Sequence, residues 1–323
     1  MNPHVLAIVG PTASGKSELA VAVARRLDGE VVSMDSRQVY RGMDIGTAKL
    51  PAVERGGIAH HGLDLMDPDR RYSAGAFARE AQGWIAAIRD RGRVPILVGG
   101  TGFFLRALTQ PIFGEPDLDP ARRRALRSWL AARPRAELAR WTRALDPDRY
   151  VLAEAGGPQR LARTLEVALL TGRALSWWHR HAPAEPRALS AMVALLELPR
   201  EELDRRIDER VARMLDGGLV EEVRGLLAKG YGPHDPGMTG VGYREVIAQL
   251  KGELEPDQTA DRMRRATRAY ARRQSTWFRN QLPPSVVRLD GMVPLPERVE
   301  QVVQAWVRAA VVRGGLTREG ANT

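Results

Sequence analysis

Cysteine is absent from the 323 residues of this sequence, which excludes disulfide bonds and any zinc or iron–sulfur site built on thiolate ligands. Long hydrophobic runs are also absent, and no stretch approaches the length of a membrane-spanning helix. The first apolar run, residues 5–9, has no basic segment before it and so does not look like an export signal. We expect a soluble cytoplasmic protein that makes no use of a membrane.

Lysine is scarce, and this scarcity qualifies the strong positive charge of the chain. The formal net charge is +10, yet the only lysines are Lys16, Lys49, Lys229 and Lys251, and all other residues of this sign are arginines. Such a charge predicts a polyanionic partner, because phosphates relieve the self-repulsion. A GC-rich genome would also favour arginine, so the positions of the arginines say more than their number.

Residues 10–17 match the phosphate-loop pattern G-x-x-x-x-G-K-[ST] and directly follow the apolar strand predicted over 5–9. Leu19, Val23 and Leu27 recur every four residues, which predicts an amphipathic helix after the loop. In this order the backbone N–H groups close around phosphate oxygens, Lys16 adds charge and Ser17 offers a hydroxyl to Mg²⁺. A glycine turn that matches by chance is the alternative, and this context disfavours it. The expected phosphate-binding residues are Gly10, Pro11, Thr12, Ala13, Ser14, Gly15, Lys16 and Ser17.

A carboxylate follows the second predicted strand. Residues 30–34 are followed by Asp35, Ser36, Arg37 and Gln38, which we expect at the carboxyl edge of an α/β sheet, where ligands bind. Asp35 is placed to accept a proton from a nucleophile. It is equally suited to cap a helix or a turn, and the sequence leaves both interpretations open.

The third predicted strand, residues 94–98, runs into a Gly99-Gly100-Thr101-Gly102 turn and carries no acid at its end. P-loop enzymes that hydrolyse nucleotides use an acid there to hold the metal, so ordinary nucleotide hydrolysis is disfavoured. The glycines allow close approach of the backbone to a ligand, which places the Thr101 hydroxyl over it. The alternative is that Thr101 only caps the following helix.

Arginines dominate a helix predicted near the carboxyl terminus. Residues 262–279 contain seven arginines and no acid. One helical stripe holds Met263, Ala266, Tyr270, Gln274 and Trp277, whereas Arg265, Arg268 and Arg272 lie on another stripe, which we expect to face outward. A face of one sign favours contacts with a phosphate backbone, and a solvated charged face is the alternative.

The chain is long enough for a nucleotide-binding fold and a second module. Prolines near residues 111–120 and 183–186 bracket a helical stretch between strand-like regions. We therefore predict an α/β fold with a P-loop NTPase-like parallel sheet core, divided into 1–117 and 187–313, a helical insertion over 118–186 and a disordered tail over 314–323. The insertion ends near Trp177 and Trp178, which fit packing at a domain interface better than stacking on bases.

Six blocks, in order and over nearly the whole chain, resemble the bacterial tRNA dimethylallyltransferases. They are residues 10–17 (GPTASGKS), 35–49 (DSRQVYRGMDIGTAK), 98–102 (VGGTG), 158–161 (PQRL), 240–244 (GVGYR) and 272–279 (RRQSTWFR). The resemblance implies transfer of a dimethylallyl group from dimethylallyl diphosphate to the exocyclic N6 amine of the adenosine 3′ of the anticodon in tRNA, with Mg²⁺. It implies that Asp35 is the proton acceptor, that Thr101 and Lys16 are also catalytic, and that Ser17 holds the metal.

The same resemblance implies contacts with the tRNA anticodon stem-loop, including one, at Arg123, carried over by spacing alone. These residues are Asp35, Ser36, Arg37, Gln38, Thr101, Arg123, Gln159, Arg160, Leu161, Ala162, Arg163, Gly240, Val241, Gly242, Tyr243, Arg244, Glu245, Arg273, Gln274, Trp277 and Arg279. We expect a monomer that recognises ATP weakly through its phosphates. The alternatives are a P-loop small-molecule kinase, which leaves the arginine helix unexplained, and an RNA-binding NTPase, which leaves the missing acid unexplained.

Overall fold

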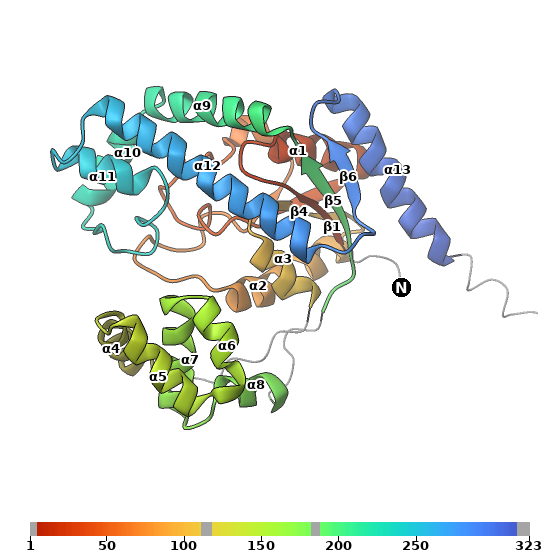
Figure 1. Cartoon of the computed structure of the whole chain (residues 1–323). Coiled ribbons are helices and arrows are strands. Elements are labelled where there is room, and N and C mark those ends of the chain that lie inside the picture. Colours follow the sequence, from red (N-terminus) through yellow and green to blue (C-terminus); the bar gives the residue numbers. More distant parts are fainter. Residues whose placement is uncertain (1–4, 111–117, 182–187, 315–323) are drawn as a thin grey trace, which may run out of the picture. The chain divides into compact units, whose positions relative to one another are not determined.

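The computed structural model describes residues 5–110, 118–181 and 188–314 (Figure 1). The chain forms two compact units, one made of residues 1–110 and 188–323 and the other of residues 111–187. The predicted tail lies outside the described residues except for its first residue, Gly314, which ends the last helix. Within the described ranges, no helix is both long enough and apolar enough to cross a membrane.

The larger unit is built on a six-stranded sheet in the order β3-β2-β4-β1-β5-β6. Every neighbouring pair in it is parallel. The strands are β1 (Val5–Val9), β2 (Gly29–Ser33), β3 (His60–His61), β4 (Val94–Gly99), β5 (Ala191–Glu197) and β6 (Val287–Asp290). Every residue of the central strand β1 is buried, as its unbroken apolar run predicts. The predicted α/β fold with a parallel sheet is thereby confirmed.

The larger unit also contains helices. They are α1 (Lys16–Leu27), η1 (Ala52–Arg55), α2 (Ala74–Asp90), α3 (Gly102–Thr109), α9 (Arg200–Asp216), α10 (Leu219–Ala228), α11 (Tyr243–Leu250), α12 (Pro256–Gln281) and α13 (Leu295–Gly314). Leu19 and Val23 of α1 and Val302 of α13 pack into one core with the sheet. A second core lies between α9, α10, α11 and α12.

The third strand predicted from the sequence is β4, the fourth strand in chain order. The structure adds β3, the pair His60–His61, which hydrogen-bonds to β2. Two residues are too few to show an alternating pattern, so this strand has no recognisable signal in the sequence. His61 Nε2 lies 2.7 Å from a carboxylate oxygen of the buried Glu30, and this interaction helps to fix β3 at the edge.

The smaller unit consists of α4 (Pro120–Ala131), α5 (Arg135–Leu145), α6 (Pro147–Ala155), α7 (Pro158–Thr171) and α8 (Leu175–His181). Three of these helices, α4, α6 and α7, begin with proline, which suits the first helical position because no N–H is required there. Leu138 and Leu165 belong to its core. Trp177 stacks on His181, and Trp178 Nε1 donates to Thr171 Oγ1 at 3.0 Å, so both rings pack inside this unit.

Candidate functional site

A cavity of about 360 Å³ opens in the larger unit where the phosphate loop, the carboxyl ends of β2 and β4, and helices α9, α11 and α12 meet. Many residues singled out from the sequence line it. They are Thr12, Lys16, Ser17, Asp35, Arg37, Gln38, Gly240, Val241, Gly242, Tyr243, Arg244, Arg273 and Gln274. The cavity therefore joins segments that are far apart in the chain.

The phosphate loop presents the start of α1 to this cavity. Gly15, the N-cap residue, has a φ of 89°, a left-handed conformation that favours glycine, and no side chain caps the helix there. Uncapped N–H groups and the helix dipole make this end suitable for an anion. Lys16 Nζ donates to Pro11 O at 3.0 Å, which holds the ammonium at the loop.

Burial and the neighbouring Arg210 guanidinium lower the pKa of Lys16 to about 8, while the Asp35 carboxylate opposes this shift. Arg210 was missed by the sequence interpretation, which assigned no functional residue to α9. It follows Ile207 by three residues and precedes Val211 and Met214 on the buried face of the helix. An arginine placed among the buried residues of an amphipathic helix is the sequence signal that could have identified it. Its Nη2 donates to Thr47 O at 3.3 Å at the cavity wall.

Asp35 serves in a turn and also faces the cavity. Its Oδ1 accepts the Arg37 N–H at 2.8 Å, so the predicted capping interpretation describes a real contact. The carboxylate nevertheless lines the cavity. It is also close enough to Lys16, Arg210 and Tyr270 to influence the pKa of each. The two interpretations are therefore compatible.

Thr101 occupies the N-cap position of α3 without capping it through its side chain. Instead, its Oγ1 accepts the Ser36 N–H at 3.3 Å and also hydrogen-bonds to the Tyr270 phenol. Burial raises the pKa of that phenol to about 12, and the nearby Asp35 carboxylate acts in the same direction. Thr101 thus ties the glycine turn to the segment that carries Asp35.

Gln274 of α12 joins the two glycine-containing loops. Its Oε1 accepts the Thr12 N–H at 2.8 Å and its Nε2 donates to Gly100 O at 2.9 Å. A Cβ on Gly100 would overlap the Gln274 amide, and one on Gly102 would overlap the Trp277 ring. The glycines are therefore needed for the close approach of α12 to the turn.

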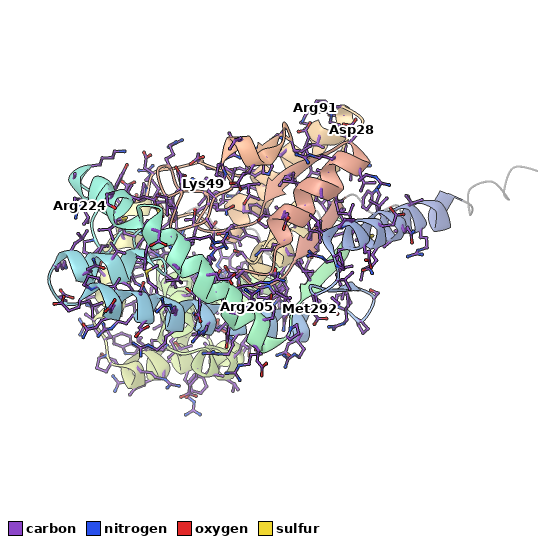
Figure 2. All side chains as sticks on the ribbon, turned by 90° about the horizontal axis from the view of Figure 1, so that it is seen from above. Asp28, Lys49, Arg91, Arg205, Arg224 and Met292 are labelled. Carbon is purple, nitrogen blue, oxygen red and sulfur yellow. The ribbon has the colours of Figure 1, made fainter. Side chains whose placement is uncertain are left out.

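The wall formed by residues 40–49 is fixed by two charged side chains that the sequence interpretation did not assign to the site. Glu222 of α10 accepts the N–H groups of Asp44, Ile45 and Gly46, at 2.9, 2.7 and 3.1 Å, and the Tyr243 hydroxyl at 2.5 Å. Lys49, which is labelled in Figure 2, is buried and donates to Tyr40 O at 3.0 Å. It also pairs with Asp44 and Asp64. These contacts make the wall rigid.

Glu245, predicted to contact tRNA, closes the start of α11. Its Oε2 accepts the Gly242 N–H at 2.7 Å, and the side chain is mostly buried. Among the arginines expected to face outward on α12, Arg268 is a correction, because it pairs with Asp208 at 2.6 Å. Arg265 and Arg272 are exposed, as expected. Asp208 comes from α9, whose packing the local sequence of α12 cannot reveal.

The other predicted tRNA-contacting residues lie outside the cavity. Trp277 and Arg279 are on α12, in the larger unit. The smaller unit holds Arg123, Gln159, Arg160, Leu161, Ala162 and Arg163. Leu161 is fully buried in the core of that unit and exposes no surface to RNA. Arg123 and Arg163 form ion pairs with the buried Glu166.

The donor set at the loop fits Mg²⁺ held chiefly by a ligand. The described residues contain no group of three or more His, Asp or Glu able to form a metal site by themselves. The exposed Ser17, in the first turn of α1, supplies one hydroxyl at the cavity. Mg²⁺ commonly takes one or two protein ligands and completes its octahedron with phosphate oxygens and water.

Comparisons with known proteins agree with this architecture. The sequence model of the family described as IPP transferase matches residues 38–281. The chain is 45% identical over 274 residues to a tRNA dimethylallyltransferase of Heliobacterium modesticaldum, covering 84% of this chain and 85% of that protein. It is 42% identical over 320 residues to a protein of the same name from Halorhodospira halophila, covering 98% and 100%.

A solved structure shows the same fold. The tRNA isopentenylpyrophosphate transferase of Bacillus halodurans superposes with a TM-score of 0.71 at 33% identity and covers 97% of this chain and 98% of that one. The relationship thus extends over both units of the chain and includes the phosphate loop. The chain belongs to the IPP transferase family.

Proposed function

We propose that the protein transfers a dimethylallyl group from dimethylallyl diphosphate to the N6 amine of the adenosine adjacent, on the 3′ side, to the anticodon of tRNA. The names of its relatives support this activity. The observation that carries the proposal is that Asp35 and Lys16 line a single cavity. This arrangement supports a proton acceptor beside the site of the leaving diphosphate.

The reaction is a displacement at the allylic carbon. The adenine nitrogen forms the new C–N bond, the C–O bond breaks and diphosphate leaves with the bonding electrons. Asp35 accepts the proton that the amine loses, a contribution typically of about 10²- to 10⁴-fold. The adenosine has to leave the loop stack to reach Asp35, which costs least in a single-stranded region.

The phosphate loop acts on the leaving group. Lys16 and the N–H groups at the start of α1 stabilise the negative charge that grows on the diphosphate. Ser17 would hold Mg²⁺ together with phosphate oxygens, and the bound ion supplies further stabilisation of the same charge. We propose further that the protein acts as a monomer in the cytoplasm.

One assay tests the activity against phosphate transfer. The full chain is incubated with Mg²⁺, tRNA and either labelled dimethylallyl diphosphate or labelled ATP. We expect label from the allyl donor on the tRNA and no comparable use of ATP. A matched tRNA in which guanosine replaces the target adenosine should remain unlabelled. Label on that control, or efficient ATP turnover without prenyl transfer, would overturn the proposal.

A further inference from the structure

Among the residues that the structure describes, one buried guanidinium beside the phosphate loop has two nitrogens without a hydrogen-bond partner. Arg298, in the first turn of α13, is only 7% exposed. Its Nε and Nη1 atoms have no hydrogen-bond partner among the residues that the structure describes. A buried charge that remains unpaired is unfavourable. An anionic ligand bound nearby would supply the missing partner.

Arg298 and a second arginine converge on the N-terminus of α1. A Cβ added to Gly15 would lie 3.8 Å from Arg298 Nη1 and 3.7 Å from Arg206 Nη1, so both guanidinium groups lie beside this glycine. Arg206 Nε donates to Glu202 Oε1 at 2.6 Å, which holds this side chain in place. Two guanidinium groups, one from α9 and one from α13, therefore reach the helix end that is suited to an anion.

Packing of α13 does not require the charge of Arg298. Val299 and Val302 are buried against the sheet core, and an exposed ion pair of 3.5 Å joins Glu300 to Arg26 of α1. Burial lowers the pKa of Arg298, and Glu18 opposes this shift. No ion pair with Arg298 is formed by any acid within the described ranges. An apolar side chain of similar length would dock the helix equally well.

The order of arginines along α9 suggests how a diphosphate would lie. Arg210 lines the same cavity as Lys16 and Asp35. Arg206 is one helical turn away, beside Gly15. If an allyl diphosphate binds with its reacting carbon near Asp35, its inner phosphate would lie near Lys16. Its outer phosphate would then lie towards Arg206.

We propose that Arg206 and Arg298 form an outer anion subsite of the phosphate loop. The pair binds the phosphate farther from the allylic carbon and so holds the leaving group in line. The identity of the donor rests on the proposed function, whereas the subsite itself requires only a diphosphate. The test therefore uses inorganic diphosphate.

Calorimetric titration of the full chain with inorganic diphosphate and Mg²⁺ tests the subsite. Replacement Arg298→Met keeps much of the apolar length and removes the charge, and we expect diphosphate to bind about 10- to 100-fold more weakly. Arg206→Met should also weaken binding, and Arg298→Lys should recover part of it. The matched control is Arg26→Met, which breaks the exposed ion pair of the same two helices and should leave affinity unchanged.

The possible outcomes of this titration distinguish the subsite from the proposed function. Unchanged affinity in both Arg298→Met and Arg206→Met, with melting temperatures close to that of the unaltered protein, overturns the subsite. If Arg298→Met does not fold, Arg298→Lys and Arg206→Met carry the test. A protein that binds diphosphate through Arg298 but transfers no allyl group to tRNA retains the subsite and refutes the proposed function. A protein that transfers the allyl group to tRNA, but whose diphosphate binding depends on neither arginine, retains the proposed function and refutes the subsite.

Discussion

The Thr12 N–H donates a 2.8 Å hydrogen bond to Gln274 Oε1, across 262 positions of the chain. The same side-chain amide donates to Gly100 O, so one α12 side chain sets the spacing of the phosphate loop and the glycine turn. Both loops border the cavity in which we propose that the proton acceptor and the leaving group meet. Gln274 was predicted to contact RNA, and its observed contacts give it a positioning role as well.

Replacement Gln274→Ala should lower kcat/KM for the allyl donor, because the Thr12 N–H and the Gly100 carbonyl lose their partner. A buried group left unpaired costs about 1–3 kcal/mol, so the melting temperature should fall as well. Gln274→Glu keeps the acceptor for Thr12 and should recover part of the activity. Ser275→Ala is the control, since Ser275 Oγ donates only to Ala271 O of its own helix. Equal kinetics in Gln274→Ala and Ser275→Ala would refute the positioning role.

The proposed role of Asp35 as proton acceptor can be separated from its role in the turn. Asp35→Asn keeps an oxygen that accepts the Arg37 N–H, but its neutral amide cannot take a proton from the amine. We expect turnover to fall by about 10²- to 10⁴-fold while diphosphate and tRNA still bind. Single-turnover kinetics with saturating tRNA measure the chemical step. Near-normal turnover in this variant would show that Asp35 only stabilises the turn and is not the proton acceptor.

Lys16 predicts a pH dependence of diphosphate binding. Because its pKa is lowered to about 8, the charged form that attracts diphosphate is present below this pH and is lost above it. Affinity should therefore fall as pH rises through about 8, by at most about tenfold per unit. Above pH 8 binding should also take up a proton, which calorimetry in buffers of different ionisation enthalpy detects. In Lys16→Met both the fall in affinity above pH 8 and the proton uptake should disappear. Any pH dependence of binding that remains comes from titration of diphosphate itself.

The sequence was sufficient for those parts of the site whose chemistry depends on local order. The phosphate loop is specified by a strand, the 10–17 pattern and an amphipathic helix in that order. Asp35 and Thr101 follow neighbouring strands whose carboxyl ends lie at the same edge of the sheet. Contacts made by distant helices were not predictable in this way. Glu222 reads as an ordinary acid in the first turn of α10, yet it binds three consecutive N–H groups of the 44–46 segment. Such roles arise only when α10 packs against that segment.

The arginines of α12 should divide into two classes. Arg268 is 31% exposed and paired with Asp208, so Arg268→Gln should lower the melting temperature and leave the salt dependence of tRNA binding nearly unchanged. Arg265 and Arg272 are exposed, and neutralising both should weaken tRNA binding and reduce its slope against log salt by about one for each phosphate that the protein no longer neutralises. Diphosphate affinity should be the same in all of these variants, because none of the three lines the cavity that holds Lys16 and Asp35. Filter binding over a range of salt concentrations measures the slopes. A slope that stays constant when Arg265 and Arg272 are neutralised would show that this face of α12 is merely solvated, whereas a slope that falls in Arg268→Gln would show that its ion pair opens to bind RNA.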